Sequence, residues 1–572
     1  MSRRAESLAS KGVNQYRARD VFAYLALRYC TDNQASRKND WIENNACQVV
    51  MANPTGNYLR TFHFKQAERP GEIEHRELFV PGAGEALAEA ALLAECASRW
   101  KGVASDRCYS YRPTEKEDRS GYFEPHMIGL RERQEKIASA CSSLPNGVVA
   151  YIDIKKFYSS ISTELAAERW LTFCNDVDMP ERLVDLGFKL IENYGKRSAD
   201  GKLITGPMFS HLLANLVLTP IDDISKSLPV TYVRYVDDIT LIGEIEHVRL
   251  SIDKLRARLG SIGLEVHDFS SPKTMVVPCQ QWLEGADDFS PGAHSTAWMK
   301  LIGDIKKVII LGISQASEVE DALFSEGFRL PVPDYATATR EVTTFQKVRA
   351  LGLWSWLRFK ARNVNTDTIL GDAKRLAESM ISETRVLLNA GKKTSGFQRK
   401  RVVSKLRYRL GRLIYIGSEP ELSTLMEGLD AWPELNYHSE IIRAIVTGNC
   451  SKVVSMGTNV AQATAQVFRS ALKTANFSDP VVTEVEIQGL AVLILNGVAV
   501  EAGVRSKEHP LLRFAMGPVD LELMEQPRGL VQELACLHGL GDQRHTSTLN
   551  TAFDIADQVV LDALEMDYRY SF

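Results

Sequence analysis

The stretch Tyr235-Val236-Asp237-Asp238 constrains this chain most, because it places two adjacent acids between two β-prone runs. The runs cover residues 231–236 and 239–242, and together they predict a β-hairpin with the acids at its tip. Aspartate is a poor strand residue, so two aspartates at such a tip indicate that their carboxylates have a functional role. The alternative is an ordinary turn in which the aspartates bond their own backbone.

A second β-prone run, residues 148–154, carries an internal acid at Asp153. An isolated acid in an apolar strand is costly unless something positive meets it. Two-metal phosphoryl transfer needs carboxylates on rigid strands to fix two Mg²⁺ ions about 3.5–4 Å apart. We therefore expect Asp153 and Asp237 to hold two Mg²⁺ ions, or Mn²⁺ in their place, with Asp238 as a supporting acid or further ligand. A capped surface acid is the alternative for Asp153.

The segment between these acids begins at Thr205-Gly206-Pro207 and continues to Asp222. Its Gly-Pro start and its apolar spacing predict a loop that enters an amphipathic helix. After the hairpin the pattern predicts a helix over residues 247–259. Gly263-Leu264-Glu265 and then Lys273 follow that helix.

The order of these four elements resembles the palm of a reverse transcriptase. Residues 310–313 are a weaker match to the primer grip of that family. The motif forms are similar to those of bacterial defence-associated enzymes (the unknown-group or Abi class), which are related to retron and group II intron reverse transcriptases. Thr205 departs from the intron type, which often has Gln there. The resemblance covers residues 60–315 and does not extend to the rest of the chain.

The resemblance implies roles for the acids and for two further residues. Asp153, Asp237 and Asp238 are the expected catalytic and metal-binding residues. Lys273 is expected to reach the pyrophosphate as a charge neutraliser or general acid, and a surface lysine is its alternative. Tyr158 stands where the family places a steric gate against the ribose 2′-hydroxyl. Phe157 is expected in the core, because two neighbours on an extended strand face opposite ways.

The remaining substrate-binding candidates come from two regions. Arg76 and Arg112, in segments that resemble the fingers, are candidates for the triphosphate because Arg forks match phosphate oxygens. The resemblance implies that Gly206 and Pro207 shape the loop under the templating base, and that Ser210 and Asn215 orient it.

A basic stretch lies outside the resemblance. Nine of the residues from Lys392 to Arg412 are Lys or Arg and none is acidic, although the formal net charge of the chain is −4. Aromatic residues interleave with these charges, a combination that suits a phosphate backbone with stacked bases. A solvated helix face is the alternative. The candidate nucleic-acid-binding residues are Arg399, Lys400, Arg401, Lys405 and Arg407.

The expected fold class is α+β, a right-hand polymerase followed by an all-α, repeat-like C-terminal domain. The length of 572 residues leaves room for several units. The expected domains are an N-terminal helical extension (1–60), fingers (61–147), a palm with an antiparallel sheet (148–315), a helical thumb or connection (316–390) and a C-terminal helical domain (391–572).

The nine cysteines show no zinc-binding spacing, and the N-terminal sequence has no apolar signal core. These features predict reduced thiols and a cytoplasmic protein without a membrane span. The expected cofactor is Mg²⁺. The expected partners are nucleic acid as RNA template or DNA product, deoxynucleoside triphosphates, a non-coding RNA, and a second copy or partner protein.

The resemblance implies an RNA-directed DNA polymerase, a nucleotidyltransferase acting in antiviral defence (abortive infection), with protein-primed or untemplated synthesis as one mode. Retron-like copying of a dedicated non-coding RNA, a group II intron maturase and an inactive nucleic-acid-binding scaffold are the alternatives.

Overall fold

The computed structural model describes residues 12, 15–16, 19–35, 56–66, 72–100, 105–114, 122–268, 274–284, 293–310, 313–332, 362–501, 508–517, 520–525 and 529–541. These residues form a mixed structure, mostly helical with small sheets, which confirms the α+β class at that level. The chain divides into two compact units. Unit 1 comprises Met1–Arg60, Glu77–Ser290 and Leu521–Arg544, and unit 2 comprises Thr61–Arg76, Pro291–Asp520 and His545–Phe572.

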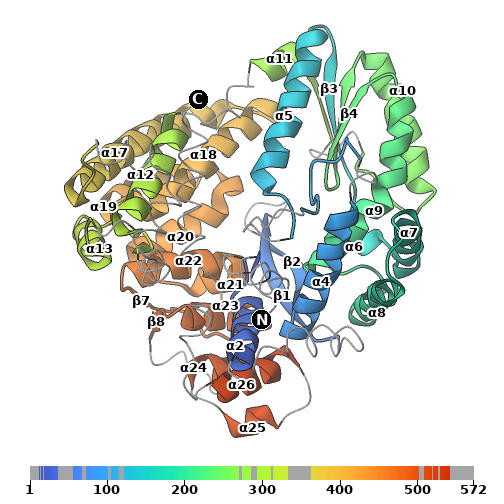
Figure 1. Cartoon of the computed structure of the whole chain (residues 1–572). Helices are drawn as coiled ribbons and strands as arrows, with labels where there is room; N and C mark the ends of the chain where they lie inside the picture. Colours follow the sequence, from blue (N-terminus) through green and yellow to red (C-terminus); the bar gives the residue numbers. More distant parts are fainter. Residues whose placement is uncertain are drawn as a thin grey trace. The chain divides into compact units, whose positions relative to one another are not determined.

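Unit 1 is built on a four-stranded antiparallel sheet (Figure 1). Its strand order is β4 (Thr231–Tyr235), β5 (Asp238–Gly243), β3 (Val148–Asp153) and β6 (Met275–Pro278). Both central strands are apolar over most of their length, and every residue of β5 after Asp238 is buried. This burial explains why the two acids at the strand ends stand out from otherwise hydrophobic runs.

Helices pack against this sheet and position its edges. Helix α5 (His126–Ser143) contacts β4 and β5, α10 (Ile245–Gly260) contacts β3 and β5, and α11 (Cys279–Leu283) contacts β3 and β6. The predicted helix over 247–259 corresponds to α10. The other elements of unit 1 are α2 (Val21–Ala35), α4 (Ala83–Arg99), α6 (Phe157–Ser160), α7 (Thr163–Asp176), α8 (Glu181–Arg197), α9 (Met208–Ile224), η2 (Ser225–Ser227), α25 (Leu521–Met524) and α26 (Leu530–Gly541).

The helix α26 packs against α2 in unit 1, although the two are far apart in the sequence. Its Glu533 accepts hydrogen bonds from the Ala83 amide (3.1 Å) and from Asn57 Nδ2 (2.6 Å), at the start of α4. The rings of Tyr29 and His538 lie 5.0 Å apart. The segment Leu521–Arg544 is assigned to unit 1, whereas the sequence predicted one C-terminal domain over 391–572.

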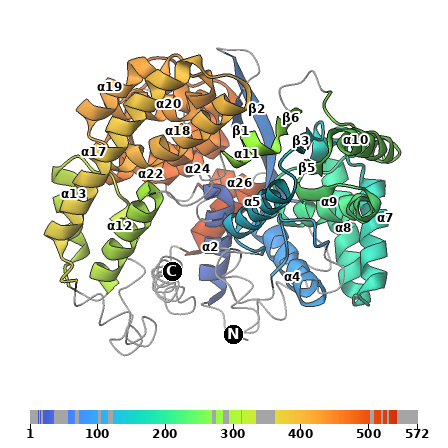
Figure 2. The same ribbon diagram turned by 90° about the horizontal axis from the view of Figure 1, so that it is seen from above.

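Unit 2 consists mainly of helices that pack on their neighbours in the sequence (Figure 2). They are α12 (Ala293–Ile310), α13 (Ala316–Ser325), α17 (Thr366–Ala390), η4 (Gly391–Lys393), α18 (Gly396–Ile416), α19 (Glu419–Leu429), η5 (Pro433–Leu435), α20 (Asn436–Thr447), α21 (Ser451–Met456), α22 (Thr458–Ser470), α23 (Glu484–Leu495) and α24 (Pro510–Met516). Two residue pairs, β7 (Thr474–Ala475) and β8 (Ala499–Val500), form a short parallel ladder, so this part is not strictly all-α.

The boundary between the units runs through the hairpin of β1 (Tyr58–Gln66) and β2 (Ile73–Pro81). Within unit 2 the hairpin lies against the start of α22, where Asn459 Oδ1 accepts from the Phe64 amide at 2.8 Å. Gly457 has a φ of +115°, and a Cβ there would lie 2.3 Å from the Phe62 carbonyl oxygen. The predicted fingers (61–147), palm (148–315) and thumb (316–390) therefore do not coincide with the observed units.

Among the helices that the structure describes, none combines the length and the apolar character needed to cross a membrane.

Candidate active site at the acidic hairpin

The three predicted acids come together in unit 1. Asp153 is the last residue of β3, and its direct partner in the antiparallel ladder is Asp238, the first residue of β5. Asp237 belongs to the two-residue turn between β4 and β5, which confirms the predicted hairpin. Directly opposed residues of an antiparallel pair have Cα atoms about 4.5–5.5 Å apart. Sheet register thus gathers acids that lie more than eighty residues apart in the chain.

The turn that carries Asp237 is strained. Val236 has a φ of +56°, a conformation that β-branched residues rarely adopt, and such strain costs on the order of 1–3 kcal/mol. Two hydrogen bonds hold it in place. The Val236 amide donates to Ser110 Oγ (2.7 Å), and Arg234 Nη1 donates to the Val236 carbonyl (2.9 Å). The direction of the turn, and with it the position of Asp237, is therefore fixed from both sides.

A buried ion pair supports this turn. Arg234 and Asp222 have side chains that are 1% and 0% exposed, and they form a two-pronged contact with distances of 2.8 and 2.6 Å. Tyr232 donates a further hydrogen bond to Asp222 at 2.9 Å. Removing one partner of such a pair costs about 3–5 kcal/mol, because the other charge remains buried. The signal in the sequence was an arginine inside an apolar strand, but its partner Asp222 was not predicted.

Asp153 also contacts the segment that follows α10. The His267 amide donates to the Asp153 carbonyl (3.0 Å), and His267 Nε2 lies 3.5 Å from Asp153 Oδ2. The Lys155 amide donates to the Glu265 carbonyl at 2.7 Å. The predicted Gly263-Leu264-Glu265 motif therefore lies next to the first acid. Lys273 and residues 311–312 of the predicted primer grip lie outside the described residues.

The donor chemistry of this site suits Mg²⁺. No group of three or more His, Cys, Asp or Glu side chains within the described part of the chain is already arranged to enclose a metal ion. Mg²⁺ is usually held by one or two carboxylates together with substrate phosphates and water, and not by an all-protein cage. Asp153 and Asp237, with Asp238 beside them, match that requirement in ligand type and number.

Tyr158 follows Asp153 by one short turn. Lys156 adopts a left-handed conformation (φ +45°), and a short helix, α6, begins after it in place of the extended strand that the sequence predicted. Phe157 is buried, as predicted, and Tyr158 is half-buried. The Tyr158 hydroxyl lies 2.5 Å from Nδ1 of His211, which holds the ring in one orientation.

His211 is a buried residue whose importance the sequence did not reveal. Its ring stacks on Tyr111 with centroids 4.1 Å apart, and Arg19 Nη2 lies 3.4 Å from its Nε2. Burial, and then the nearby Arg19, lower the pKa of His211 well below its ordinary value, so the ring is neutral. Because an arginine only donates, Nε2 accepts and Nδ1 carries the proton. Nδ1 therefore donates to the hydroxyl oxygen of Tyr158.

A glycine and two buried hydrogen bonds fix the conformation of the loop before α9. Gly206 has a φ of +126°, and a Cβ there would lie 2.3 Å from the Phe79 carbonyl oxygen, so only glycine fits. Pro207 follows directly before the first residue of α9. Ser210 donates to the Ile204 carbonyl (2.6 Å) and Asn215 donates to the Ser110 carbonyl (2.9 Å). Both side chains are buried, so they act on the backbone of the neighbouring loops.

The first amides of α9 bond to a buried carboxylate. Glu89 of α4 accepts from the Met208 amide (2.7 Å) and from the hydroxyls of Tyr194 (3.0 Å) and Tyr58 (3.3 Å). Burial raises the pKa of Glu89 from 4.5 to about 7. The sequence did not predict this contact, because Glu89 lies on a helix more than a hundred residues from α9.

The two candidate triphosphate arginines lie in surroundings that the sequence did not predict. Arg112 forms ion pairs with Glu124 (2.8 Å) and Glu132 (2.6 Å), so two carboxylates already offset its charge. Arg76 is exposed on the part of β2 that belongs to unit 2, whereas the three acids belong to unit 1.

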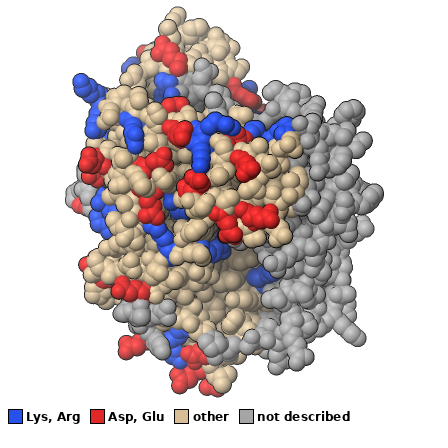
Figure 3. All heavy atoms as spheres, turned by 90° about the vertical axis from the view of Figure 1, so that its left-hand side faces the viewer, with Lys and Arg blue, Asp and Glu red and all other residues tan. Residues whose placement is uncertain are grey.

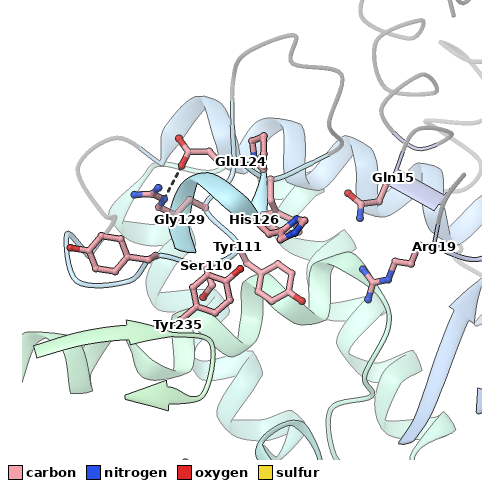
Figure 4. Close-up of a pocket in the computed structure, with 12 residues that line it drawn as sticks. Gln15, Arg19, Ser110, Tyr111, Glu124, His126, Gly129 and Tyr235 are labelled. Carbon is pink, nitrogen blue, oxygen red and sulfur yellow. Dashed lines mark ion pairs between the residues drawn. The ribbon is translucent and has the colours of Figure 1, made fainter. Parts of the chain in front are cut away.

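A pocket of about 350 Å³ lies in unit 1 beside the hairpin (Figure 4). Tyr235 of β4 forms part of its wall, next to Tyr111. Residues 109–112, residues 123–126 and the N-terminal residues Gln15 and Arg19 line the rest. The pocket therefore connects β4, the strand that leads into the turn with Asp237, with the aromatic residues around His211.

The basic stretch 392–412 forms η4 and the single helix α18 in unit 2. Arg399 contacts Glu434 through both prongs of its guanidinium and lies 4.4 Å from the Trp432 ring centre, and Arg407 donates to the Glu434 carbonyl at 3.0 Å. These two candidates therefore have structural partners. Lys400 is exposed, and Arg401 and Lys405 are half-buried. On the face in Figure 3, blue Lys and Arg atoms alternate with red Asp and Glu atoms and do not gather in one patch.

The sequence matches no protein-family model and shows no significant similarity to a curated protein. The case for a function therefore depends on the residues and on their geometry.

Proposed function

We propose that this chain is a reverse transcriptase-type DNA polymerase that adds deoxynucleotides by two-metal phosphoryl transfer. The observation that carries the proposal is the sheet register that pairs Asp153 with Asp238 beside Asp237 in the turn. Carboxylates that sheet register places next to one another are what metal-assisted phosphoryl transfer requires. The antiparallel sheet, with α10 packed against it and α9 joined to β4 by the Asp222–Arg234 ion pair, is also compatible with the palm of a right-hand polymerase.

Each residue of the site has a role in this proposal. Asp153 and Asp237 hold the metal ions, and Asp238 supports them. When bound, the ions polarise the primer 3′-hydroxyl and neutralise charge on the leaving pyrophosphate. Ser110 and Arg234 keep the turn in its strained conformation, so that Asp237 is positioned before substrate arrives.

Tyr158 excludes the ribose 2′-hydroxyl and thereby selects deoxynucleotides. The supporting observation is the hydrogen bond from His211, which fixes the half-buried ring five residues after Asp153. A ring that cannot move away presents a constant steric barrier. The gate therefore consists of a pair, in which Tyr158 contacts the sugar and His211 positions Tyr158.

The proposal extends to the partners named from the sequence. Mg²⁺, deoxynucleoside triphosphates and an RNA template or DNA product follow from the chemistry. A role in antiviral defence, with protein-primed or untemplated synthesis, follows from the resemblance of the motifs to the defence-associated class. Retron-like copying of a non-coding RNA and a maturase use the same site. An inactive nucleic-acid-binding scaffold is the alternative from another class.

The test is nucleotide incorporation by the full chain with Asp237→Asn. Asparagine keeps the shape of the side chain and removes its charge, so we expect incorporation of labelled deoxynucleotides with Mg²⁺ or Mn²⁺ to fall at least about a thousandfold, equivalent to about 4 kcal/mol. The measurement uses a primer and template in one arm and no added template in the other. The second arm separates templated from untemplated synthesis.

The matched control is Asp223→Asn, an exposed aspartate of α9 whose ion pair with Lys226 lies at the surface. Surface pairs contribute little to stability, so this variant should keep full activity. Thermal unfolding of both variants checks that each is folded. Activity of Asp237→Asn equal to that of the control would exclude the polymerase and favour the scaffold.

A further inference from the structure

The pocket beside the acidic hairpin has a wall chemistry that identifies its ligand class. We infer that it binds one unstacked nucleobase of a single-stranded nucleic acid, so that the strand passes the acids with one base held in the pocket. This inference rests on the proposed function, because it names the form of nucleic acid that the same site engages.

Four of the twelve residues that line the pocket are tyrosine or phenylalanine. They are Tyr109, Tyr111, Phe123 and Tyr235, and they come from three separate parts of unit 1. Aromatic side chains stack on bases without regard to sequence, because every base has a π-face. An aliphatic ligand would not need four rings.

The aromatic residues are held in place before any ligand binds. Tyr111 has a φ of +45° and stacks on His211, and its ring lies 5.3 Å from that of Phe123. The Tyr109 amide donates to the Arg234 carbonyl of β4 at 2.9 Å. A preformed stacking surface loses little conformational entropy on binding, which favours a small planar ligand.

The charge of the pocket favours a neutral ring over a phosphate. The positive charge of Arg112 is offset by the carboxylates of Glu124 and Glu132, so the part of the wall that Arg112 forms is not strongly positive. Arg19 is directed to the neutral His211 ring and to the Met208 sulfur, so it brings one positive charge to the pocket. A site for a triphosphate would need several arginine or lysine groups with their charge available.

The volume and position fit a single base. About 350 Å³ lies at the lower end of the range for small-molecule pockets, which is about 300–1,000 Å³. Gln15 lines the pocket, and its Oε1 accepts from the Tyr122 amide at 3.4 Å, while its Nε2 can donate to the edge of a base. Tyr235 is the residue directly before the Val236-Asp237 turn, so a base in the pocket belongs to a strand that runs past the acids.

The experiment compares two oligonucleotides of equal length and charge. One carries thymine at every position and the other carries abasic sugars, so their difference reports base contacts and not phosphate contacts. Binding to the full chain is measured by fluorescence anisotropy at one salt concentration, without Mg²⁺ or nucleoside triphosphates. We expect the wild type to prefer the thymine oligonucleotide by about tenfold, within the range for one stacked base.

Tyr109→Leu removes one ring, and Tyr109→Phe keeps it as the matched control. The leucine variant should lose most of the preference, to about twofold, while the phenylalanine variant retains it. His126→Ala, at an exposed residue of the pocket wall, is the second variant and should lower the preference without a risk to folding. Thermal unfolding confirms that each variant is folded.

Equal binding of the two oligonucleotides by the wild type, or an unchanged preference in both Tyr109→Leu and His126→Ala, overturns the inference. Absence of binding to either oligonucleotide also overturns it. The incorporation assay reports separately on the polymerase. If the protein incorporates nucleotides but shows no preference for the thymine oligonucleotide, the base-binding role of the pocket is wrong and the polymerase proposal stands. If it shows the preference but incorporates no nucleotide, the pocket binds a base and the polymerase proposal is wrong.

Discussion

At the scale of single residues, buried charged groups organise the candidate site more than the acids themselves do. The ion pair of Arg234 with Asp222 supports the turn that carries Asp237, and Glu89 accepts a hydrogen bond from the Met208 amide at the start of α9. Each is costly to bury and is tolerated because its hydrogen-bonding capacity is used. The acids of the site can therefore remain partly exposed for a ligand while a rigid network behind them sets their positions.

Glu89 gives a pH-dependent prediction. Its pKa is about 7 in the folded chain and 4.5 is its ordinary value, so the folded state retains a proton that the unfolded state releases. The stabilisation is complete below pH 4.5 and is lost as the pH rises to 7. Glu89→Gln cannot titrate, so the loss of stability that it causes should shrink by about 3 kcal/mol between pH 4.5 and 7.5.

The measurement is the free energy of unfolding of both proteins in denaturant across that pH range. The difference between the two proteins is the relevant quantity, because His211, Asp20 and Glu533 also titrate differently in the folded chain. A difference that stays constant with pH would mean that the hydrogen bonds from Met208, Tyr194 and Tyr58 to Glu89 outweigh its burial.

At the scale of elements, the sequence predicts what depends on local pattern. The acidic hairpin, the strand that ends at Asp153 and the helix after Pro207 all follow from alternation, helical spacing and turn residues. The short helix at Tyr158 did not follow, because it depends on a left-handed Lys156. Partners such as Asp222, Glu89 and His211 could not be predicted either, since only tertiary packing brings them to their contacts.

The basic helix α18 shows the same limit, because a run of charges does not reveal how each charged side chain packs. Arg399 lies between Glu434 and Trp432, whereas Lys400 is exposed. Reversing Arg399 would therefore disturb packing and could not report on nucleic acid. The prediction for nucleic-acid binding applies to Lys400, Arg401 and Lys405.

Changing those three residues to Glu should weaken binding of single-stranded nucleic acid and flatten its salt dependence. The slope of log K against log salt should fall by about two units, because each phosphate contact to a single strand contributes about 0.7. Arg399→Gln is the control, and it should lower the unfolding temperature and leave the slope unchanged. If the triple variant keeps the wild-type slope, Lys400, Arg401 and Lys405 form a solvated face of α18 and do not contact nucleic acid.

At the scale of the whole chain, sequence order and structural unit do not coincide. Unit 1 uses the segment 521–544 together with residues 1–60 and 77–290. Unit 2 contains Thr61–Arg76 of the β1–β2 hairpin together with its helices. Local patterns carry no information about such pairings, which is why the predicted order of fingers, palm, thumb and C-terminal domain along the sequence differs from the division into these two units.

The last prediction follows from the place of α26 in unit 1. Ending the chain after Asp520 removes the Glu533 contacts at the start of α4 and the packing of the buried Leu534, so α2 and α4 should exchange their amide hydrogens faster. The helices α17–α20 of unit 2 should keep their protection, because none of these contacts involves them. Hydrogen exchange read by mass spectrometry distinguishes the two regions. A chain that ends after Gly541 is the matched control and should protect α2 and α4 as the full chain does. Faster exchange in α18–α20 with unchanged α2 and α4 would instead support a single C-terminal domain over 391–572.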